Sequence, residues 1–304
     1  LALAAALPRS AEARGRMITV LRLDQPASAA FNRNPEPADP DDPFAAPAPA
    51  PASATLTGRV TAAAIYFDGT YYDIPREQVY LMETGSAMSV LHRGKYVGSA
   101  MLTQADMYPC CDLPMTSGVT VDLAENPGDV KTLLAVTGDA PSATRTYRAQ
   151  ISMSAINAYH REYVRVGQVG LGKHGVPQDQ AARAQPADFA IVRPAPGKTA
   201  LIAGSLVVPR AIPECTHVYN RTECVRHAFF MVAKHEDKSL RPVIWSYADG
   251  DNLAGQGWEN PVDVIDVDND GDADLITRVC DLQACSFRIY SYHDGDLTLV
   301  FRGT

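Results

Sequence analysis

The chain of 304 residues is long enough for one large domain or two smaller ones. Its net charge of −8 and its scattered Lys and Arg residues argue against a nucleic acid or an anionic membrane surface as the partner, because both require concentrated positive charge. With 46% hydrophobic residues the chain can bury a core, yet no apolar run after the first residues reaches the length of a transmembrane helix.

The start of the chain predicts export. Residues 1–7 are apolar, and Ala11-Glu12-Ala13 has the small-x-small form that signal peptidase cleaves. The positively charged region that usually opens a signal peptide is missing, so we expect residues 1–13 to be a truncated one. The protein is therefore expected to be periplasmic or secreted.

A Pro- and Ala-rich stretch follows, from Gln25 to about Ala54, and it shows no apolar periodicity. Such a segment cannot bury enough surface to offset the entropy lost on ordering. We therefore expect residues 14–55 to form a disordered N-terminal tether.

Short apolar runs broken by Gly, Pro and Asp occupy the rest of the chain and predict a mainly β fold. A β-rich domain is expected over residues 56–205, with strands at Arg59–Phe67, Val79–Met82, Thr132–Thr137, Thr146–Met153, Tyr163–Val169, Phe189–Val192 and Thr199–Val208. Within it, Ser154–Tyr163 is a candidate short helix and Gly175–Ala187 a candidate loop.

A second module is expected over residues 206–304, and its short strands are again separated by turn residues. These strands are His227–Lys234, Pro242–Tyr247, Val262–Ile265, Leu275–Val279, Ser286–Tyr292 and Leu297–Phe301. Together the two modules predict antiparallel sheets in a sandwich or a propeller-like arrangement. No repeat of fixed period is present, so a complete propeller would need degenerate blades.

Six cysteines fall into three close pairs, which in an exported protein predicts disulfides. The pairs are Cys280 with Cys285, Cys215 with Cys224, and the adjacent Cys110 with Cys111. The first pair is the best candidate, because its disulfide would close a short loop between two strands. A bond between adjacent cysteines would be strained, so the third pair leaves its partners open.

Zinc is an alternative for the middle pair, because two imidazoles stand near the two thiols. The four residues are Cys215, His217, Cys224 and His227. Their spacing matches no compact zinc knuckle, and export favours the disulfide.

The most informative segment is acidic. Val264–Thr277 contains five carboxylates at alternate positions with a Gly among them: Asp266, Asp268, Asp270, Asp272 and Asp274. These charges repel each other strongly unless a cation lies among them, and hard oxygen ligands in a flexible loop suit Ca²⁺. We expect one Ca²⁺, bound by the side chains of Asp266, Asp268, Asp270 and Asp274 and by the backbone carbonyl of Asp272.

This loop differs from an EF-hand, which needs a Glu at its twelfth position and a helix on each side. Thr277 is at that position, and both flanks look like strands. The pattern D-x-D-x-D-G-x-x-D-L resembles the calcium loops of FG-GAP and VCBS-type repeats, in which the loop joins two strands of a propeller blade. The resemblance covers about His227 to the C-terminus and implies a structural calcium in a four-stranded blade.

The same acidic turn, followed by a strand, a protruding loop and a Tyr-rich strand, also resembles periplasmic i-type lysozyme inhibitors and related immunity proteins against secreted peptidoglycan hydrolases. The protruding loop would be Asp281, Leu282, Gln283 and Ala284, between Cys280 and Cys285. A disulfide there would supply the rigidity that insertion into an enzyme cleft requires. The Ser-Gly-rich inhibitory loop of that family is absent from this position.

The resemblance implies a non-enzymatic protein whose partner is another protein, namely a cell-wall hydrolase. Two alternatives remain: an envelope or surface adhesion module, and a glycan-processing enzyme. Candidate acid–base residues for the enzyme are His160 and His235, which lie near acidic residues, and Trp245 or Trp258 could stack on a sugar ring or pack in the core. No nucleophile elbow, phosphate loop, dinucleotide fingerprint or His-Glu-x-x-His motif is present.

Overall fold

The computed structural model describes residues 15–31, 53–74, 84–105, 116–137, 153–192, 199–211, 224–236, 239–251, 257–267, 270–281, 285–293 and 296–303. Several predicted features lie outside these ranges: the signal peptide, the strand Val79–Met82, most of the strand Thr146–Met153, Cys110, Cys111, Cys215, Asp268 and Leu282–Ala284. Across the described residues the fold is mainly β and antiparallel, as the sequence predicts.

The N-terminal part is a closed barrel. Its strands are β1 (Arg16–Leu23), β2 (Ala54–Phe67), β4 (Ala87–His92), β5 (Lys95–Ala105), β6 (Thr116–Leu123) and β7 (Thr132–Thr137), with the short β3 (Thr70–Tyr72) beside β2. The order is β1-β7-β4-β5-β6-β2-β3, and the additional pairing of β1 with β2 closes six strands into a ring. Closure leaves no unpaired edge between the six strands.

One prediction for the N-terminus needs correction. Residues 16–31, assigned to the disordered tether, form β1 and the short helix α1 (Ala27–Phe31). Apolar residues at β1 face the barrel interior, where Leu21 and Leu23 pack with Phe31 and Leu56. The Pro/Ala composition begins only after β1, so the tether prediction extended over a strand whose apolar residues are sufficient to join the core.

The helix α2 (Met153–Lys173) is longer than predicted and replaces a predicted strand, Tyr163–Val169. Tyr163 is fully buried, and its single hydroxyl proton is shared between the carbonyl oxygens of Gly204 (2.5 Å) and Met231 (2.9 Å). Gly170 lets the helix approach the sheet, because a Cβ there would lie 2.5 Å from Phe229. The run was therefore mistaken for a strand because a buried helix face can show the same apolar density.

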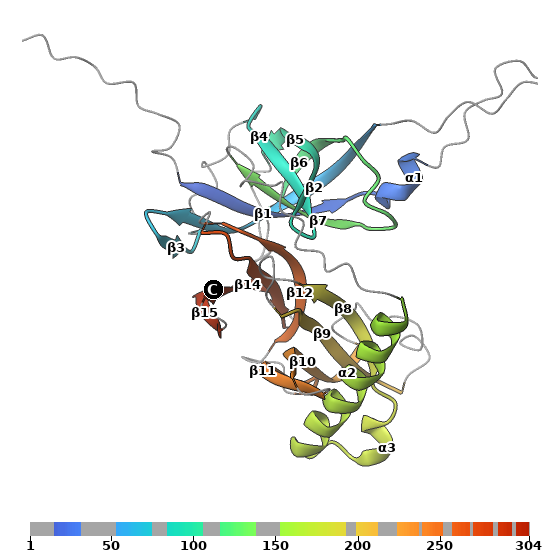
Figure 1. Ribbon diagram of the computed structural model, residues 1–304. Helices are drawn as coiled ribbons and strands as arrows, with labels where there is room; N and C mark the ends of the chain where they lie inside the picture. Colours follow the sequence, from blue (N-terminus) through green and yellow to red (C-terminus); the bar gives the residue numbers. More distant parts are fainter. Residues whose placement is uncertain are drawn as a thin grey trace, which may run out of the picture.

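The second sheet contains β8 (Gln185–Val192), β9 (Leu201–Pro209), β10 (Val225–Glu236) and β11 (Ser239–Asp249), in the order β11-β10-β9-β8. The predicted loop Gly175–Ala187 instead contains the short helix α3 (Gln178–Ala181) and the start of β8. Strand β9 runs through residue 205, where the sequence suggested a domain boundary. In Figure 1, α2 and α3 cover the outer face of this sheet.

The third sheet is a meander of β12 (Trp258–Ile265), β13 (Asp274–Cys280), β14 (Cys285–His293) and β15 (Asp296–Arg302). One apolar cluster joins it to the second sheet, through residues such as Phe230 and Leu275. Another joins it to the outside of the barrel, where Leu134 and Ile289 belong to one cluster. The third sheet is thus the central layer between barrel and second sheet (Figure 1).

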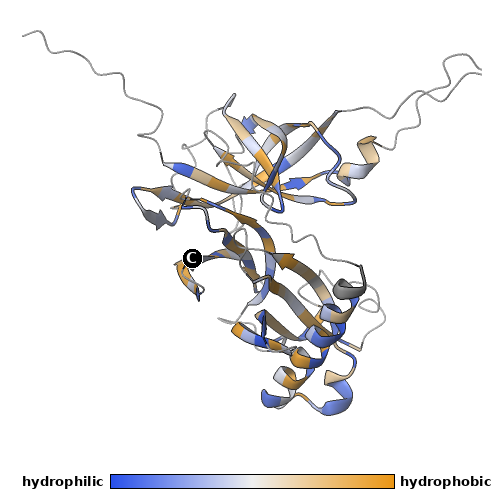
Figure 2. Ribbon diagram, viewed as in Figure 1, coloured by the Kyte–Doolittle hydropathy of each residue, from blue (hydrophilic) through white to orange (hydrophobic). Residues whose placement is uncertain are grey.

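Hydrophobic residues run along the strands of all three sheets, whereas α2 also carries hydrophilic residues (Figure 2). Two successive four-stranded meanders match the expectation of antiparallel sheets. The arrangement of a barrel plus two sheets is neither a clear sandwich nor a clear propeller, so the finer prediction is not reproduced.

Candidate functional site

The acidic segment forms the turn between β12 and β13, and two of its carboxylates are buried inside it. Asp266 and Asp274 are only 4% and 2% exposed. Oδ2 of Asp266 accepts a hydrogen bond from the backbone N–H of Gly271 (3.1 Å), whose φ of 96° is suited to Gly. Oδ2 of Asp274 accepts from the backbone N–H of Val267 (3.2 Å) and from the hydroxyl of Tyr71 (2.8 Å). The two carboxylates therefore fix the turn, and Tyr71 ties it to the barrel.

A second group of side chains gathers at the surface of this turn. Carboxylate oxygens of Asp270 and Asp272 and a ring nitrogen of His293 all lie within 4.8 Å of one another, so these residues could hold a metal ion. Asp270 and Asp272 belong to the predicted ligand set, although Asp272 contributes its side chain here rather than its carbonyl oxygen. His293 was missed, because it comes from the end of β14, and only the pairing of β14 with β13 brings it near the turn.

The fit of a cation to this turn follows from the donor chemistry. Burying the charges of Asp266 and Asp274 is costly, and a nearby cation lowers that cost as well as the mutual repulsion of the five carboxylates. Oxygen donors dominate the group, which suits Ca²⁺, whereas the imidazole of His293 is more typical of transition metals. Asp270, Asp272 and His293 could therefore hold a metal ion, and their geometry does not identify which one.

The opposite end of β13 carries the predicted disulfide. Cys280 is bonded to Cys285, and the two residues face each other as the last pair of the β13–β14 hairpin. Strand β13 has seven residues, which places the disulfide about 20 Å from the acidic turn. The predicted partner-binding loop has four residues. The structure describes Asp281, and the other three lie outside the described ranges.

The zinc alternative for the middle cysteines does not hold for Cys224, which is disulfide-bonded and buried. Its predicted partner, Cys215, lies outside the described residues. The second zinc candidate, His227, forms a hydrogen bond between its Nδ1 and the hydroxyl of Tyr247 (3.0 Å). Burial lowers the pKa of its imidazole. A sulfur committed to a disulfide cannot act as a thiolate ligand.

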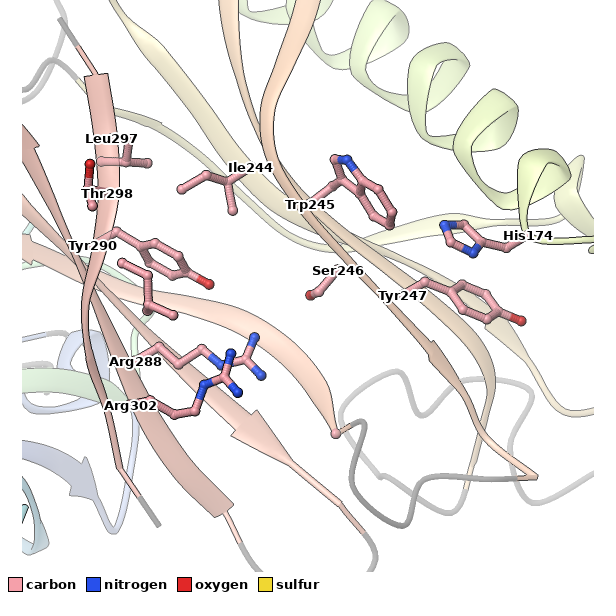
Figure 3. Close-up of a pocket in the computed structure, with 12 residues that line it drawn as sticks. His174, Ile244, Trp245, Ser246, Tyr247, Arg288, Tyr290, Leu297, Thr298 and Arg302 are labelled. Carbon is pink, nitrogen blue, oxygen red and sulfur yellow. The ribbon is translucent and has the colours of Figure 1, made fainter.

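A cleft of about 700 Å³ opens between β11 of the second sheet and β14 and β15 of the third sheet (Figure 3). Its polar lining includes Ser246, Tyr290, Arg288 and Arg302. The cleft runs along β14 and β15: Arg288 lies near the disulfide end of the third sheet, whereas Leu297 pairs with Tyr292 toward the acidic-turn end.

A buried carboxylate, Glu259, organises one wall of this cleft. Its side chain is 0% exposed. Oε1 accepts hydrogen bonds from the hydroxyls of Thr277 and Tyr290, both at 2.7 Å. Oε2 accepts from Ser246 (2.8 Å) and from Nη1 of Arg288 (2.5 Å). Four donors from three strands therefore hold a single charged group.

This network positions the groups around Glu259. Each of its oxygens already accepts two hydrogen bonds, and the side chain has no access to solvent, so it is better suited to orient neighbours than to exchange protons with a substrate. Burial and the adjacent Glu259 charge raise the pKa of Tyr290 well above its usual value, which keeps the phenol protonated as a donor. Arg288 and Tyr290 are thereby held in fixed orientations at the cleft.

Sequence reasoning missed Glu259. A single Glu before Asn260 and Pro261 gives no motif, and its partners come from β11, β13 and β14, far away in the chain. The one available signal was an isolated acidic residue beside a Trp in a region of apolar strands.

The two histidines of the enzyme hypothesis both make aromatic contacts at α2. His160 packs against Phe189 with ring centroids 5.4 Å apart, and His235 packs against Tyr159 at 5.2 Å. The two tryptophans also differ in burial. Trp258 is buried in the core, with 3% of its surface exposed, whereas Trp245 lines the cleft and is 54% exposed.

Comparison of the chain with protein-family models, curated proteins and solved structures gives no match. Among the described helices, none combines the length and the apolar character needed to cross a membrane.

Proposed function

We propose that this chain is a non-enzymatic, calcium-binding, extracytoplasmic protein that binds and inhibits a peptidoglycan hydrolase. The observation that carries the proposal is the β13–β14 hairpin, which a disulfide closes at its tip beside an open cleft. The Arg288 end of the cleft lies three residues from Cys285, so the cleft and the hairpin could contact the same partner. Such a surface suits a protein partner that has a groove of its own.

The disulfide contributes by reducing the cost of binding. A loop that inserts into an enzyme groove loses conformational freedom, and a loop that is already closed by a covalent bond loses less. The supporting strands are rigid as well, since β13 and β14 pair along their length and both contribute buried residues to the core. The predicted contact loop, Asp281–Ala284, joins these two strands in the chain.

Calcium would act at the other end of the sheet. Asp270 and Asp272 would bind the ion, and Asp266 and Asp274 would hold the turn around it. When bound, Ca²⁺ would supply positive charge that offsets the repulsion of the carboxylates. Because about 20 Å separates this turn from the hairpin, we expect calcium to act through fold stability and not through contact with the partner.

The test is lysis of peptidoglycan by a panel of secreted hydrolases, with and without the mature protein, in calcium and again in chelator. Stoichiometric protection against one enzyme supports the proposal. A double variant, Asp281→Ala with Gln283→Ala, should abolish protection while the protein stays folded. The matched control is Asp296→Ala, an exposed acidic residue at the opposite end of the sheet, which should protect as the unmodified protein does.

Other outcomes decide between the alternatives. Absence of protection by the folded, calcium-loaded protein would contradict the inhibitor proposal and favour an adhesion module, which should bind cells or matrix instead. Degradation of peptidoglycan by the protein alone would indicate a glycan-processing enzyme.

A further inference from the structure

We infer that the cleft between β11 and β14–β15 is a binding site for a small ligand that carries a carboxylate beside an apolar group. This inference is independent of the proposed hydrolase partner. It rests on a pair of guanidinium groups at the cleft, on the buried acid that orients one of them, and on the apolar side chains opposite.

The two arginines occupy directly opposite positions on neighbouring strands. Arg288 on β14 and Arg302 on β15 are register partners, and their guanidinium groups lie side by side in Figure 3. Like charges at opposite positions in a sheet destabilise it. Glu259 offsets part of this repulsion by pairing with Arg288, and an anion between the two guanidinium groups would offset the rest.

Glu259 orients only one member of the pair. Nη1 of Arg288 donates to Oε2 of Glu259, and the Arg288 side chain is 19% exposed, so part of the guanidinium reaches the cleft. A guanidinium has five N–H donors in a planar fork, which leaves donors of Arg288 for a ligand. Arg302 is exposed on the edge strand β15 and can approach the same ligand from the other side.

The charge balance favours a carboxylate. Two guanidinium groups and one buried carboxylate leave a net charge of about +1 in the wall of the cleft. A carboxylate neutralises that charge, whereas a phosphate dianion would leave an excess negative charge in a chain whose net charge is already −8. The planar carboxylate also matches the fork of a guanidinium through two parallel hydrogen bonds.

The remaining lining determines what is attached to the carboxylate. Ile244 on β11 and Leu297 and Leu299 on β15 line the cleft, and Leu299 is 37% exposed. Apolar side chains around a few oriented polar groups are typical of small-molecule sites, and a volume of about 700 Å³ is within the range of such sites. The ligand class is thus a small carboxylic acid with an apolar substituent.

The test uses matched pairs of probes that differ only in charge. N-acetyl-leucine, N-acetyl-phenylalanine and N-acetyl-tryptophan are titrated into the full chain by calorimetry, each beside its uncharged amide. Phenyl phosphate is included as the dianionic competitor. We expect at least one acid to bind ten-fold or more tightly than its amide, and to bind more tightly than phenyl phosphate.

Variants then locate the site. Arg302→Gln should weaken binding of that acid at least five-fold, and it should fold normally because Arg302 is exposed. Arg288→Lys keeps a positive charge for Glu259 but loses the planar fork, so it should also weaken binding. The control Arg183→Gln removes a 65% exposed side chain that follows α3 and does not line the cleft, so it should leave affinity unchanged.

Two outcomes would overturn the inference as a whole, and a third would overturn its choice of ligand charge. One is that no acid in the panel binds more tightly than its own amide. The other is that Arg302→Gln, Arg288→Lys and Arg183→Gln have the same affinity as the unmodified chain, because the bound acid would then lie elsewhere. Tighter binding of phenyl phosphate than of every acid would contradict the carboxylate assignment.

Discussion

The barrel and the C-terminal sheets bury different kinds of residue. Among the described residues, the barrel strands bury only two polar side chains, Thr19 and Ser117. The second and third sheets bury seven, namely Ser205, Glu259, Asn260, Asp263, Asp266, Asp274 and Thr277, and four of these are acidic. Six of the seven lie in β12, in β13 or in the turn between them.

The two kinds of buried residue contribute differently to the free energy of folding. Buried apolar groups stabilise a fold whatever their exact partners, whereas a buried carboxylate costs several kcal/mol unless it is fully hydrogen-bonded. The third sheet nevertheless keeps four buried acidic groups, and three of them lie at a candidate site: Glu259 at the cleft, and Asp266 and Asp274 at the acidic turn. The barrel offers a stable base, and the polar chemistry is concentrated in the central sheet.

The strongest test of this contrast is Glu259→Gln. The change removes the charge that pairs with Arg288 and replaces one accepting oxygen with a donating amide, so at least one buried hydroxyl loses its acceptor. Breaking a buried ion pair from one side costs about 3–5 kcal/mol. We expect a loss of that size in the free energy of unfolding, measured by urea denaturation.

The matched control is Glu125→Gln, which removes the exposed partner of Lys95 at the edge of the barrel. Exposed ion pairs contribute about 0–1 kcal/mol, so this variant should be almost as stable as the unmodified chain. Equal losses in the free energy of unfolding would mean that the buried Glu259 network stabilises the fold no more than an exposed ion pair does.

A second test asks whether the barrel and the sheets unfold together. Leu133 and Leu134 are adjacent on β7 and both are buried, but Leu133 faces the barrel interior and Leu134 faces the third sheet. Each change to Ala should cost about 3 kcal/mol through lost burial and a cavity. Because one apolar cluster joins barrel and sheet, both variants should lower a single shared transition.

The readout is tryptophan fluorescence. Trp245 and Trp258 both lie in the C-terminal sheets, so their emission does not report the barrel directly. A lower urea midpoint in Leu133→Ala, seen by fluorescence, would demonstrate coupling across the interface. If that variant changes only the far-UV circular dichroism and leaves the fluorescence midpoint unmoved, the barrel unfolds as an independent unit.

The sequence pattern predicted many of the strands because the signals for a strand lie within the strand itself and in its flanking turns. Thr132–Thr137 is matched by β7 at both ends, and each predicted segment of the third sheet lies within an observed strand, although β12 begins four residues earlier than predicted. The short loop between Cys280 and Cys285 likewise indicated its own disulfide. Period-2 alternation and turn residues are sufficient for such features.

The candidate sites required long-range information. His293 reaches Asp270 only through the register of β13 and β14, and the donors around Glu259 come from separate strands. Closure of the barrel depends on β1, which pairs with β2 across about 40 residues of chain. No local pattern encodes these pairings, whereas β1 itself is a local apolar run that the tether prediction extended over.

A smaller effect should appear in the pH dependence of stability. Burial raises the pKa of Asp263 from 3.8 to about 6, although its carboxylate accepts hydrogen bonds from the backbone N–H groups of Val264 and Arg93. Between these pKa values the folded state binds more protons than the unfolded state, so the free energy of unfolding falls as pH rises. The total loss is about 3 kcal/mol, and it is complete above pH 6.

Asp263→Asn should remove this slope, and at pH 7 the variant should be at least as stable as the unmodified chain. Urea denaturation at intervals from pH 4 to pH 7.5 measures both proteins side by side, so that contributions of other groups cancel in the difference. A constant difference over the whole range would show that Asp263 has the same pKa in both states.

The smallest expected effect concerns the hairpin disulfide. Replacing both Cys280 and Cys285 with Ser removes a cross-link that closes a loop of about six residues, which corresponds to a loss of about 2 kcal/mol. Urea denaturation should detect this loss, while the thermal shift on adding calcium should be unchanged, because the acidic turn lies at the other end of β13. A calcium shift that disappears together with the disulfide would show that the two ends of the third sheet are coupled. Calcium could then influence the hairpin, and through it a bound partner, by a route other than overall stability.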